Sequence, residues 1–239
     1  MSFTILFLMN DRTRELLCYL ETYLQSRVPG SRLEKTRLPK VPELSLYLMN
    51  EDYPRDGLNR EQVLALMDDP PYWCFCWASG QVLGRCVLDN PDWVRGKTVV
   101  DLGAGSGVVG IAAKLAGAGR VILCDLDEKA LRAEELNGRI NGVNVDFSSS
   151  VEELLKEEDV NEWVITVADV FYDRENLPLL KTMLKRSGTV LVSDSRLKGQ
   201  LLQGMDIIGH HDSHTVPDLD ESREFNRVTL YRSRQQTPS

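Results

Sequence analysis

Short apolar runs alternate with amphipathic segments along most of the chain. Residues 99–102 and 120–124 are brief aliphatic runs rich in β-branched residues, the pattern of buried parallel strands. Between them, an alanine-rich stretch at residues 108–116 predicts a helix that ends at Gly117 and Gly119. Glycines at alternate positions separate the first strand from this helix. The pattern therefore indicates a βαβ unit whose first turn is rich in glycine.

The same alternation continues toward the C-terminal region. Further strands are expected at residues 143–147, 163–168, 188–192, 206–209 and 225–231. Further helices are expected from Ala78 or Ser79 to Leu88, over residues 128–139, through Leu154 and Leu155, from Leu177 to Leu184, and near residues 199–202. Strands that alternate with helices predict an α/β fold with a Rossmann-like, mostly parallel, doubly wound sheet. The last strand is expected to be antiparallel.

The first third of the chain follows a different pattern and forms an N-terminal helical lead-in. Apolar residues at helical spacing predict an amphipathic helix over residues 11–27 and a second helix over residues 60–67. Residues 32–53 are mixed, and the prolines in and around them argue against a regular element. We therefore divide the chain into a helical and irregular extension, residues 1–71, and a ligand-binding domain, residues 72–239.

Composition narrows the choice of partner and compartment. The 239 residues are 42% hydrophobic, enough for a packed core, and carry a net charge of -8. An acidic chain repels a phosphate backbone, so we expect that no nucleic acid is a partner of this protein. A basic protein segment would be attracted to it. No apolar run is long enough to span a membrane, so we expect no membrane partner. Five cysteines without C-x-x-C spacing indicate free thiols and a cytoplasmic protein.

Two interpretations of the glycine-rich turn compete. Residues 105–110 fit the dinucleotide fingerprint G-x-G-x-x-G, whereas residues 101–107 fit the first motif of methyltransferases that use S-adenosylmethionine (AdoMet). The Asp101 carboxylate would repel a pyrophosphate but attract the ammonium and sulfonium groups of AdoMet. Asp125, after the second strand, suits either cofactor because it can accept hydrogen bonds from ribose hydroxyls. We favour AdoMet over a dinucleotide, and over a turn that only packs a helix on the sheet.

Carboxylates follow four of the five expected parallel strands. Ligands of open α/β sheets bind at the carboxyl ends of the strands. These ends lie at residues 101–107, Asp125, residues 148–150, residues 169–173 and Asp194. The predicted site is therefore acidic and suits a cationic ligand or substrate.

The histidines His210, His211 and His214 raise the question of a metal site. No second group of ligands lies nearby in the sequence, so we interpret them as surface residues and expect no metal. The sequence also lacks a G-x-S-x-G nucleophile elbow, and a catalytic triad finds no support.

Four stretches of the sequence together resemble one family. They are residues 72–83, which read YWCFCWASGQVL, residues 89–97, residues 101–107, and the segment DVFYD at residues 169–173. They are similar to the seven-β-strand (class I) lysine methyltransferases that modify the electron transfer flavoprotein β subunit, and to their bacterial relatives. The resemblance extends over about residues 36–232, and DVFYD is its more discriminating part.

The resemblance and the motif together give a set of cofactor residues. These are Trp77, Asp101, Gly103, Gly105, Gly107, Asp125, Leu126, Ser149 and Ala168. By the resemblance, the glycines would line the methionine end of AdoMet and Asp125 would take the ribose. Leu126 would flank the adenine, and Trp77 would close the pocket. Ser149 and Ala168 complete the set at the ends of the third and fourth strands.

The acceptor residues implied by the resemblance are Asp169, Tyr172 and Asp173, which would face an incoming lysine. A lysine amine must lose its proton before it can attack, because its free pKa is near 10.4. Asp169 or Asp173 could orient the amine and pass its proton to water, and Tyr172 could guide the substrate. The alternative is that Asp173 only caps its helix and Asp169 only ends a strand.

The predicted function is AdoMet-dependent transfer of a methyl group to a lysine amine on a protein. The electron transfer flavoprotein β subunit is a candidate partner. Residues 193–197, SDSRL, depart from the Gly-Asp-Pro-Gly-Arg of the family, and residues 148–150 lack its acidic residue. The identity of the protein substrate therefore stays open. A small-molecule N-methyltransferase and a non-catalytic AdoMet-binding module are the alternative functions.

Overall fold

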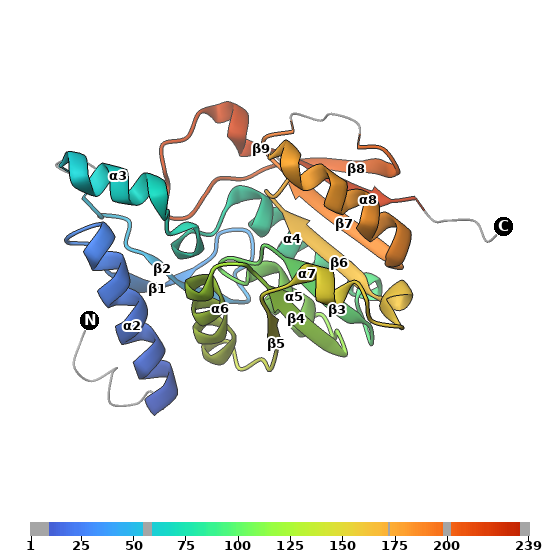
Figure 1. Ribbon diagram of the computed structural model, residues 1–239, viewed down its shortest axis with the longest axis horizontal. Helices are drawn as coiled ribbons and strands as arrows, with labels where there is room; N and C mark the ends of the chain where they lie inside the picture. The colour runs from blue at the N-terminus through green and yellow to red at the C-terminus, as the bar shows by residue number, and fades with distance from the viewer. Residues whose placement is uncertain (1–9, 55–58, 172, 198–201, 235–239) are drawn as a thin grey trace.

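A seven-stranded sheet forms the centre of the molecule (Figure 1). The computed structural model describes residues 10–54, 59–171, 173–197 and 202–234. The sheet contains β3 (Thr98–Leu102), β4 (Arg120–Cys124), β5 (Asp146–Ser148), β6 (Val164–Ala168), β7 (Thr189–Asp194), β8 (Met205–Asp212) and β9 (Arg227–Ser233). Their order across the sheet is β5-β4-β3-β6-β7-β9-β8. Neighbouring strands from β5 to β7 are parallel, and β9 runs antiparallel to both β7 and β8. The expected fold class is confirmed.

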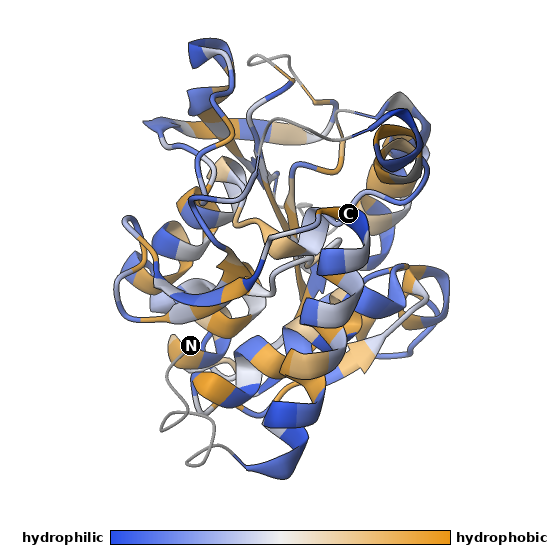
Figure 2. Ribbon diagram, turned by 90° about the vertical axis from the view of Figure 1, so that its left-hand side faces the viewer, coloured by the Kyte–Doolittle hydropathy of each residue, from blue (hydrophilic) through white to orange (hydrophobic). Residues whose placement is uncertain are grey.

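Helices cover both faces of this sheet because the strands bury side chains on both. They are α4 (Ala78–Asp89), α5 (Val108–Leu115), α6 (Glu128–Ile140), α7 (Val151–Leu154) and α8 (Leu177–Arg186). Neighbouring residues of a strand point to opposite faces, and Val99 accordingly packs in one core with α4 and α5. Val100 packs in a second core with α7 and α8. Figure 2 shows the result, with mostly hydrophobic strands between helices that carry both kinds of residue.

The N-terminal extension packs against α6 through a third core. Helix α2 (Asp11–Arg27) was expected over the same residues, and its buried leucines share a core with Ala130, Ala133 and Leu136 of α6. Asn10 caps the start of helix α2, because its side chain accepts a hydrogen bond from the Thr13 N–H at 2.8 Å. Helix α3 (Arg60–Asp68) is one residue longer than expected. Figure 1 places α2 and α3 at the end of the molecule away from β8.

Residues 32–53 contain two strands, so the expectation of no regular element there was wrong. β1 (Leu33–Arg37) and β2 (Ser45–Met49) pair antiparallel. Pro39 and Pro42 lie in the connection between the two strands, where they remove no hydrogen bond from the ladder. The Asn137 side chain also accepts a hydrogen bond from the Tyr47 N–H at 2.7 Å and thereby ties β2 to α6.

Other differences from the expected elements concern their ends. β5 begins later than the expected strand and has only three residues, whereas β7 and β8 are longer than expected. Most of the helix expected near residues 199–202 lies outside the described residues. Among the helices of the described residues, none is both long and apolar enough to cross a membrane.

Candidate active site

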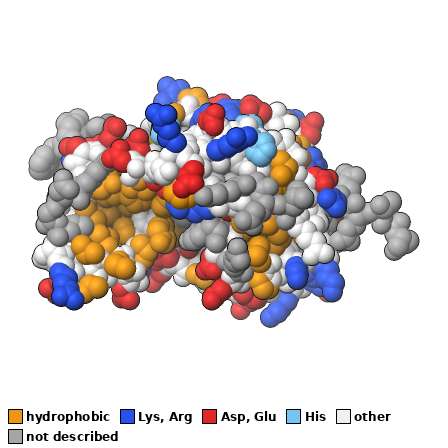
Figure 3. Space-filling view, turned by 90° about the horizontal axis from the view of Figure 1, so that it is seen from above, with side chains coloured by type: hydrophobic (Ala, Val, Ile, Leu, Met, Phe, Trp, Pro, Cys, Tyr) orange, Lys and Arg blue, Asp and Glu red, His pale blue; other side chains and the backbone are white. Residues whose placement is uncertain are grey.

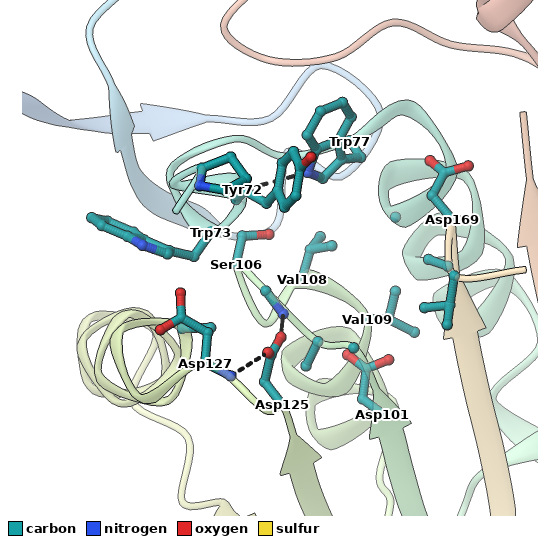
Figure 4. Close-up of a pocket in the computed structure, with 18 of the residues that line it drawn as sticks. Tyr72, Trp73, Trp77, Asp101, Ser106, Val108, Val109, Asp125, Asp127 and Asp169 are labelled. Carbon is teal, nitrogen blue, oxygen red and sulfur yellow. Dashed lines mark hydrogen bonds between the residues drawn. The ribbon is translucent and has the colours of Figure 1, made fainter. Parts of the chain in front are cut away.

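A cavity of about 370 Å³ opens at the carboxyl ends of β3, β4 and β6. Its walls come from the glycine-rich turn after β3, the aromatic segment before α4, the turn after β4 and the end of β6. Figure 4 shows the side chains that point into this space from these elements. The position agrees with the general rule that ligands of α/β sheets bind outside the carboxyl ends of the strands.

The glycine-rich turn needs its glycines for conformation and for space. Gly103, Gly105 and Gly107 have φ angles of 65°, 54° and 79°, in the left-handed region that L side chains rarely adopt. A Cβ atom at Gly103 would also lie 2.8 Å from Cγ2 of Val170, inside van der Waals contact. Gly103 and Gly105 line the cavity. The bare backbone of this turn can therefore approach a ligand closely.

Asp125 connects the turn after β4 to the glycine-rich turn. Its Oδ2 accepts a hydrogen bond from the Gly105 N–H at 3.0 Å, and its Oδ1 accepts one from the Asp127 N–H at 3.0 Å (Figure 4). Both aspartates line the cavity. Burial raises the pKa of the Asp125 carboxyl, and the two N–H donors oppose that shift. The carboxylate is thereby fixed in place at the wall, where a ribose hydroxyl could reach it.

Asp101 lies deeper than the other carboxylates, and its oxygens already have protein partners. Oδ2 accepts a hydrogen bond from the Gly110 N–H of α5 at 2.9 Å, and Oδ1 accepts one from the Thr166 hydroxyl at 2.9 Å. Its exposed fraction is 2%, and burial raises its pKa to about 7. Asp101 still lines the floor of the cavity (Figure 4). It therefore also stabilises the junction of β3, α5 and β6.

Asp169 follows β6 in a conformation that is rare for a residue with a side chain. Its φ angle is 51°, and its Oδ1 accepts hydrogen bonds from both the N–H and the hydroxyl of Ser195, each at 3.0 Å. Burial raises the pKa of the Asp169 carboxyl, while the Ser195 donors and the charge of Arg196 oppose the shift. Ala168, Asp169 and Arg196 line the cavity together. The turn after β7 thus holds the carboxylate at the end of β6.

An aromatic wall closes the cavity opposite the strands. The Trp77 ring lies 5.8 Å from the Tyr72 ring, and the Trp77 indole N–H donates to the Tyr72 carbonyl at 3.2 Å. The Arg196 guanidinium lies 5.9 Å from the centre of the Trp77 ring. Tyr72, Trp73 and Trp77 all line the cavity (Figure 4). Trp73 is also part of the core, with an exposed fraction of 1%, so it belongs to both the core and the pocket wall.

Comparisons with known proteins agree with this architecture. The model of the family "Ribosomal protein L11 methyltransferase (PrmA)" matches residues 86–194. The electron transfer flavoprotein β subunit lysine methyltransferase of Homo sapiens is 38% identical over 146 residues, which are 61% of this chain and 54% of that protein. Its Xenopus laevis counterpart is 39% identical over 167 residues, which are 67% and 66% of the two chains. The chain belongs to the seven-β-strand methyltransferases.

A solved methyltransferase structure carries the same fold. A putative AdoMet-dependent methyltransferase from Streptococcus mutans superposes with a TM-score of 0.54 at 11% identity, over 86% of this chain and 56% of that chain. The chain spans about half the length of the human relative that it matches. The class uses AdoMet, and the glycine-rich turn with Asp125 beside it fits that cofactor.

Four predicted site residues, Gly107, Leu126, Ser149 and Asp173, lie outside the cavity lining. Leu126 is 85% exposed, and Ser149 is exposed one residue beyond the end of β5. Asp173 is exposed as well, and its Oδ1 accepts a hydrogen bond from the Glu175 N–H at 3.0 Å. This bond lies at the start of the short 3-10 helix Arg174–Asn176, whereas the N-cap residue of α8 is Asn176. Tyr172 lies outside the described residues. The sequence predicted the positions of the strand ends, but it did not predict the direction in which the side chains at these positions point.

Sequence reasoning also missed residues that line the cavity, notably Ser106, Asp127, Val170 and Arg196. Asp127 could have been found, because it directly precedes the helix expected over residues 128–139 and so is a candidate N-cap at the carboxyl end of the second strand. Arg196 lies in the segment that departs from the family pattern, and nothing in the sequence marks it. Among the described residues, no group of histidine, cysteine, aspartate or glutamate side chains could hold a metal ion.

Proposed function

We propose that this chain transfers a methyl group from AdoMet to a lysine amine on a protein. The observation that carries the proposal is Asp169, which lines the cavity in a left-handed conformation and is held there by Ser195. A non-glycine residue in such a conformation costs about 1–3 kcal/mol and concentrates at functional sites. A carboxylate fixed at the cavity wall suits the binding and orientation of an amine.

The residues of the cavity fit the cofactor. AdoMet, when bound, supplies a methyl group on a sulfonium and remains as S-adenosylhomocysteine once the methyl has been taken. Asp125 would accept hydrogen bonds from the ribose, and the glycine-rich turn leaves room for the backbone to meet the methionine portion. The carboxylates of Asp125, Asp127 and Asp169 give the cavity a negative potential that favours a cationic ligand.

The chain's own residues can prepare the acceptor amine. Asp169 would accept a hydrogen bond from the amine and thereby aim its lone pair into the cavity, and the amine proton would pass to water. Arg196 lies at the same wall, and its positive charge disfavours a protonated amine nearby. Alignment of the two reactants by Asp169 and the aromatic wall supplies much of the acceleration that such a displacement needs.

A protein is the acceptor that the observations favour. The matching relatives from Homo sapiens and Xenopus laevis are named for a lysine of the electron transfer flavoprotein β subunit, and that subunit is the first candidate substrate. The net charge of -8 favours a basic protein segment and disfavours a nucleic acid. We also propose a cytoplasmic location, because the five cysteines are free thiols, which suits a reducing compartment.

Radiolabelled AdoMet distinguishes the proposal from its alternatives. The protein is incubated with the label and a cell lysate, and in parallel with purified electron transfer flavoprotein β subunit. We expect label in the protein fraction and, by mass spectrometry, a methylated lysine. Label in the small-molecule filtrate alone would favour a small-molecule methyltransferase. Binding of AdoMet in a thermal-shift assay without transfer of label to any fraction would favour a non-catalytic binding module. A rise in melting temperature with NAD and none with AdoMet would contradict the assignment of AdoMet as the cofactor.

A further inference from the structure

Asp69 is the meeting point of side chains from the N-terminal helix α2 and from α6. Its Oδ2 accepts a hydrogen bond from the Tyr23 hydroxyl at 2.5 Å and lies 3.3 Å from Nη2 of Arg27. The same oxygen lies 3.4 Å from Nζ of Lys129, on α6. The Tyr23 hydroxyl lowers the pKa of the Asp69 carboxyl, which is therefore ionised at neutral pH. Asp69 thus joins three elements that are distant in the sequence.

Lys129 carries this connection on to the cavity. Its Nζ lies 3.0 Å from Oδ1 of Asp127, and the same oxygen accepts the hydrogen bond of the Lys129 N–H at 2.8 Å that caps α6. The Asp127 N–H donates to Asp125, which in turn accepts the Gly105 N–H. An unbroken chain of contacts therefore runs from α2, through Asp69 and Lys129, to two aspartates of the cavity wall and to the glycine-rich turn.

A second set of contacts supports the same wall. The Tyr23 ring lies 6.3 Å from the Trp73 ring, and the Lys129 ammonium lies 5.0 Å from the centre of the Tyr23 ring. Trp73 lines the cavity, and so does Pro70, which directly follows Asp69 in the chain. Tyr23 therefore supports both the segment that carries Pro70 and Trp73 and the side chain of Lys129.

The charges explain why the site needs this support. Asp125 and Asp127 are two residues apart, and the charge of Asp127 contributes to the raised pKa of Asp125. Lys129 offsets that repulsion by pairing with Asp127. The side chains of Asp69, Lys129 and Asp127 have exposed fractions of 34%, 21% and 29%, so water screens their interaction less than it screens a fully exposed pair.

We infer that Asp69 is a positioning residue for the adenosine half of the cofactor, and that the N-terminal extension is part of the cofactor site. Tyr23 and Arg27 hold Asp69, Asp69 holds Lys129, and Lys129 sets the position of Asp127 beside Asp125. This inference rests on the proposed function, because it takes AdoMet as the occupant of the cavity. The family match begins at residue 86, so it does not include Tyr23, Arg27 or Asp69.

Calorimetry with two ligands tests the inference. S-adenosylhomocysteine contains both halves of the cofactor, whereas 5′-methylthioadenosine contains the adenosine half and lacks the amino acid. We expect Asp69→Asn to weaken the binding of both ligands by a similar factor, roughly three- to tenfold, the scale of one partly buried charge contact. Tyr23→Phe keeps the ring against Trp73 and removes only the hydroxyl, so it should weaken both ligands in the same direction by a smaller factor.

Glu135→Gln is the matched control. Glu135 accepts two hydrogen bonds from Arg12, at 3.0 and 2.6 Å, so this variant also cuts an ion pair between α2 and α6. Neither residue lines the cavity. We expect Glu135→Gln to lower the melting temperature but to leave both dissociation constants unchanged.

The outcomes separate this inference from the proposed function. Equal losses of affinity in Asp69→Asn and Glu135→Gln would show that only docking of α2 matters, and would overturn the inference. An unchanged constant for 5′-methylthioadenosine in a folded Asp69→Asn protein would overturn it too. If Asp69→Asn does not fold, the dissociation constants of Tyr23→Phe and Glu135→Gln are compared instead. Weaker binding of both ligands in Tyr23→Phe alone supports the inference, and equal constants in the two variants overturn it. A wild-type protein that binds neither ligand contradicts the proposed function itself.

Discussion

The Oδ2 atom of Asp125 and the backbone nitrogen of Gly105 lie 3.0 Å apart, and this hydrogen bond joins the turns that follow β4 and β3. One carboxylate therefore both shapes the glycine-rich turn and faces the cavity. Any change at Asp125 acts on the cofactor site twice, through the lost acceptor and through the freed turn.

Asp125→Ala is expected to weaken AdoMet binding by about 1.5–3 kcal/mol, the scale of a hydrogen bond to a charged group, or roughly ten- to a hundredfold. Calorimetric titration measures the change. Asp146→Ala is the control, because Asp146 pairs with Arg120 on the exposed side of the neighbouring strands and does not line the cavity. An unchanged dissociation constant in Asp125→Ala would place the ribose elsewhere.

Asp101 gives the stability of the fold a defined dependence on pH. Its pKa rises from 3.8 to about 7 on burial, so the folded state binds this proton more tightly than the unfolded chain does. The resulting stabilisation is fully present below the unfolded pKa and is lost as the pH rises through the folded pKa. Asp101→Asn removes this titration and can keep the contacts to Gly110 and Thr166.

We therefore expect the free energy of unfolding of the wild type to fall relative to that of Asp101→Asn by about 2 kcal/mol between pH 5.5 and pH 8. Urea titrations of both proteins across this pH range measure the difference between their free energies of unfolding. The contributions of other titrating groups are common to both proteins and largely cancel in that difference. A constant difference would show that Asp101 is ionised throughout, and that its hydrogen bonds outweigh its burial.

Asp169→Asn keeps the shape of the side chain, and its amide oxygen can still accept the Ser195 hydrogen bonds. It removes the charge that would orient the acceptor amine. Turnover should fall about tenfold to a thousandfold while AdoMet affinity stays within a factor of two or so. Single-turnover methylation and calorimetry together measure both quantities. Parallel loss of affinity would make Asp169 a cofactor residue, and full activity would leave it without a catalytic part.

Gly110 is required for packing and not for a positive φ angle. A Cβ atom there would lie 2.1 Å from Cδ2 of Leu123 and 3.2 Å from Cγ1 of Val121, so either these buried side chains or α5 itself would have to shift. Gly110→Ala should destabilise the protein by about 1–3 kcal/mol, as overpacking does. Gly84→Ala in α4 is the control, because its nearest neighbours lie at ordinary contact distances of 3.6 Å.

Gly84→Ala should be neutral or stabilising by up to about 1 kcal/mol, the helix propensity difference between glycine and alanine. Urea denaturation of the two variants gives the comparison. Equal stability of Gly110→Ala and the wild type would show that the α5–β4 junction can expand without loss.

The elements around the glycine-rich turn could be predicted because their signals are local. β3, α5 and β4 follow from β-branched runs, helical periodicity and glycines, and their bounds agree with the structure to within one residue. The hairpin of β1 and β2 could not be found in that way. Its pairing joins residues that are distant in the sequence, from Arg37 with Ser45 to Leu33 with Met49. In addition, Glu34, Lys35 and Arg37 obscure the strand pattern of β1.

The cofactor end of the site was easier to predict than the acceptor end. Gly103, Gly105 and Asp125 belong to a motif with fixed spacing, and all three line the cavity. Residues near the end of a strand are different, because one step along the chain reverses the direction of the side chain. Asp169 accordingly faces the cavity, whereas Ser149 faces solvent just beyond the three-residue β5.

The order of the strands also constrains how the sheet assembles. β9 follows β8 in the chain but lies between β7 and β8, and in the described sheet β8 pairs with β9. β8 therefore joins the sheet only through β9, either after β9 has docked on β7 or together with it. Long-range pairings of this kind form late in folding, so the outer edge of the sheet is expected to be its last part to assemble. During synthesis, β8 would leave the ribosome before its partner and would depend on chaperones or on the solubility of its own exposed residues.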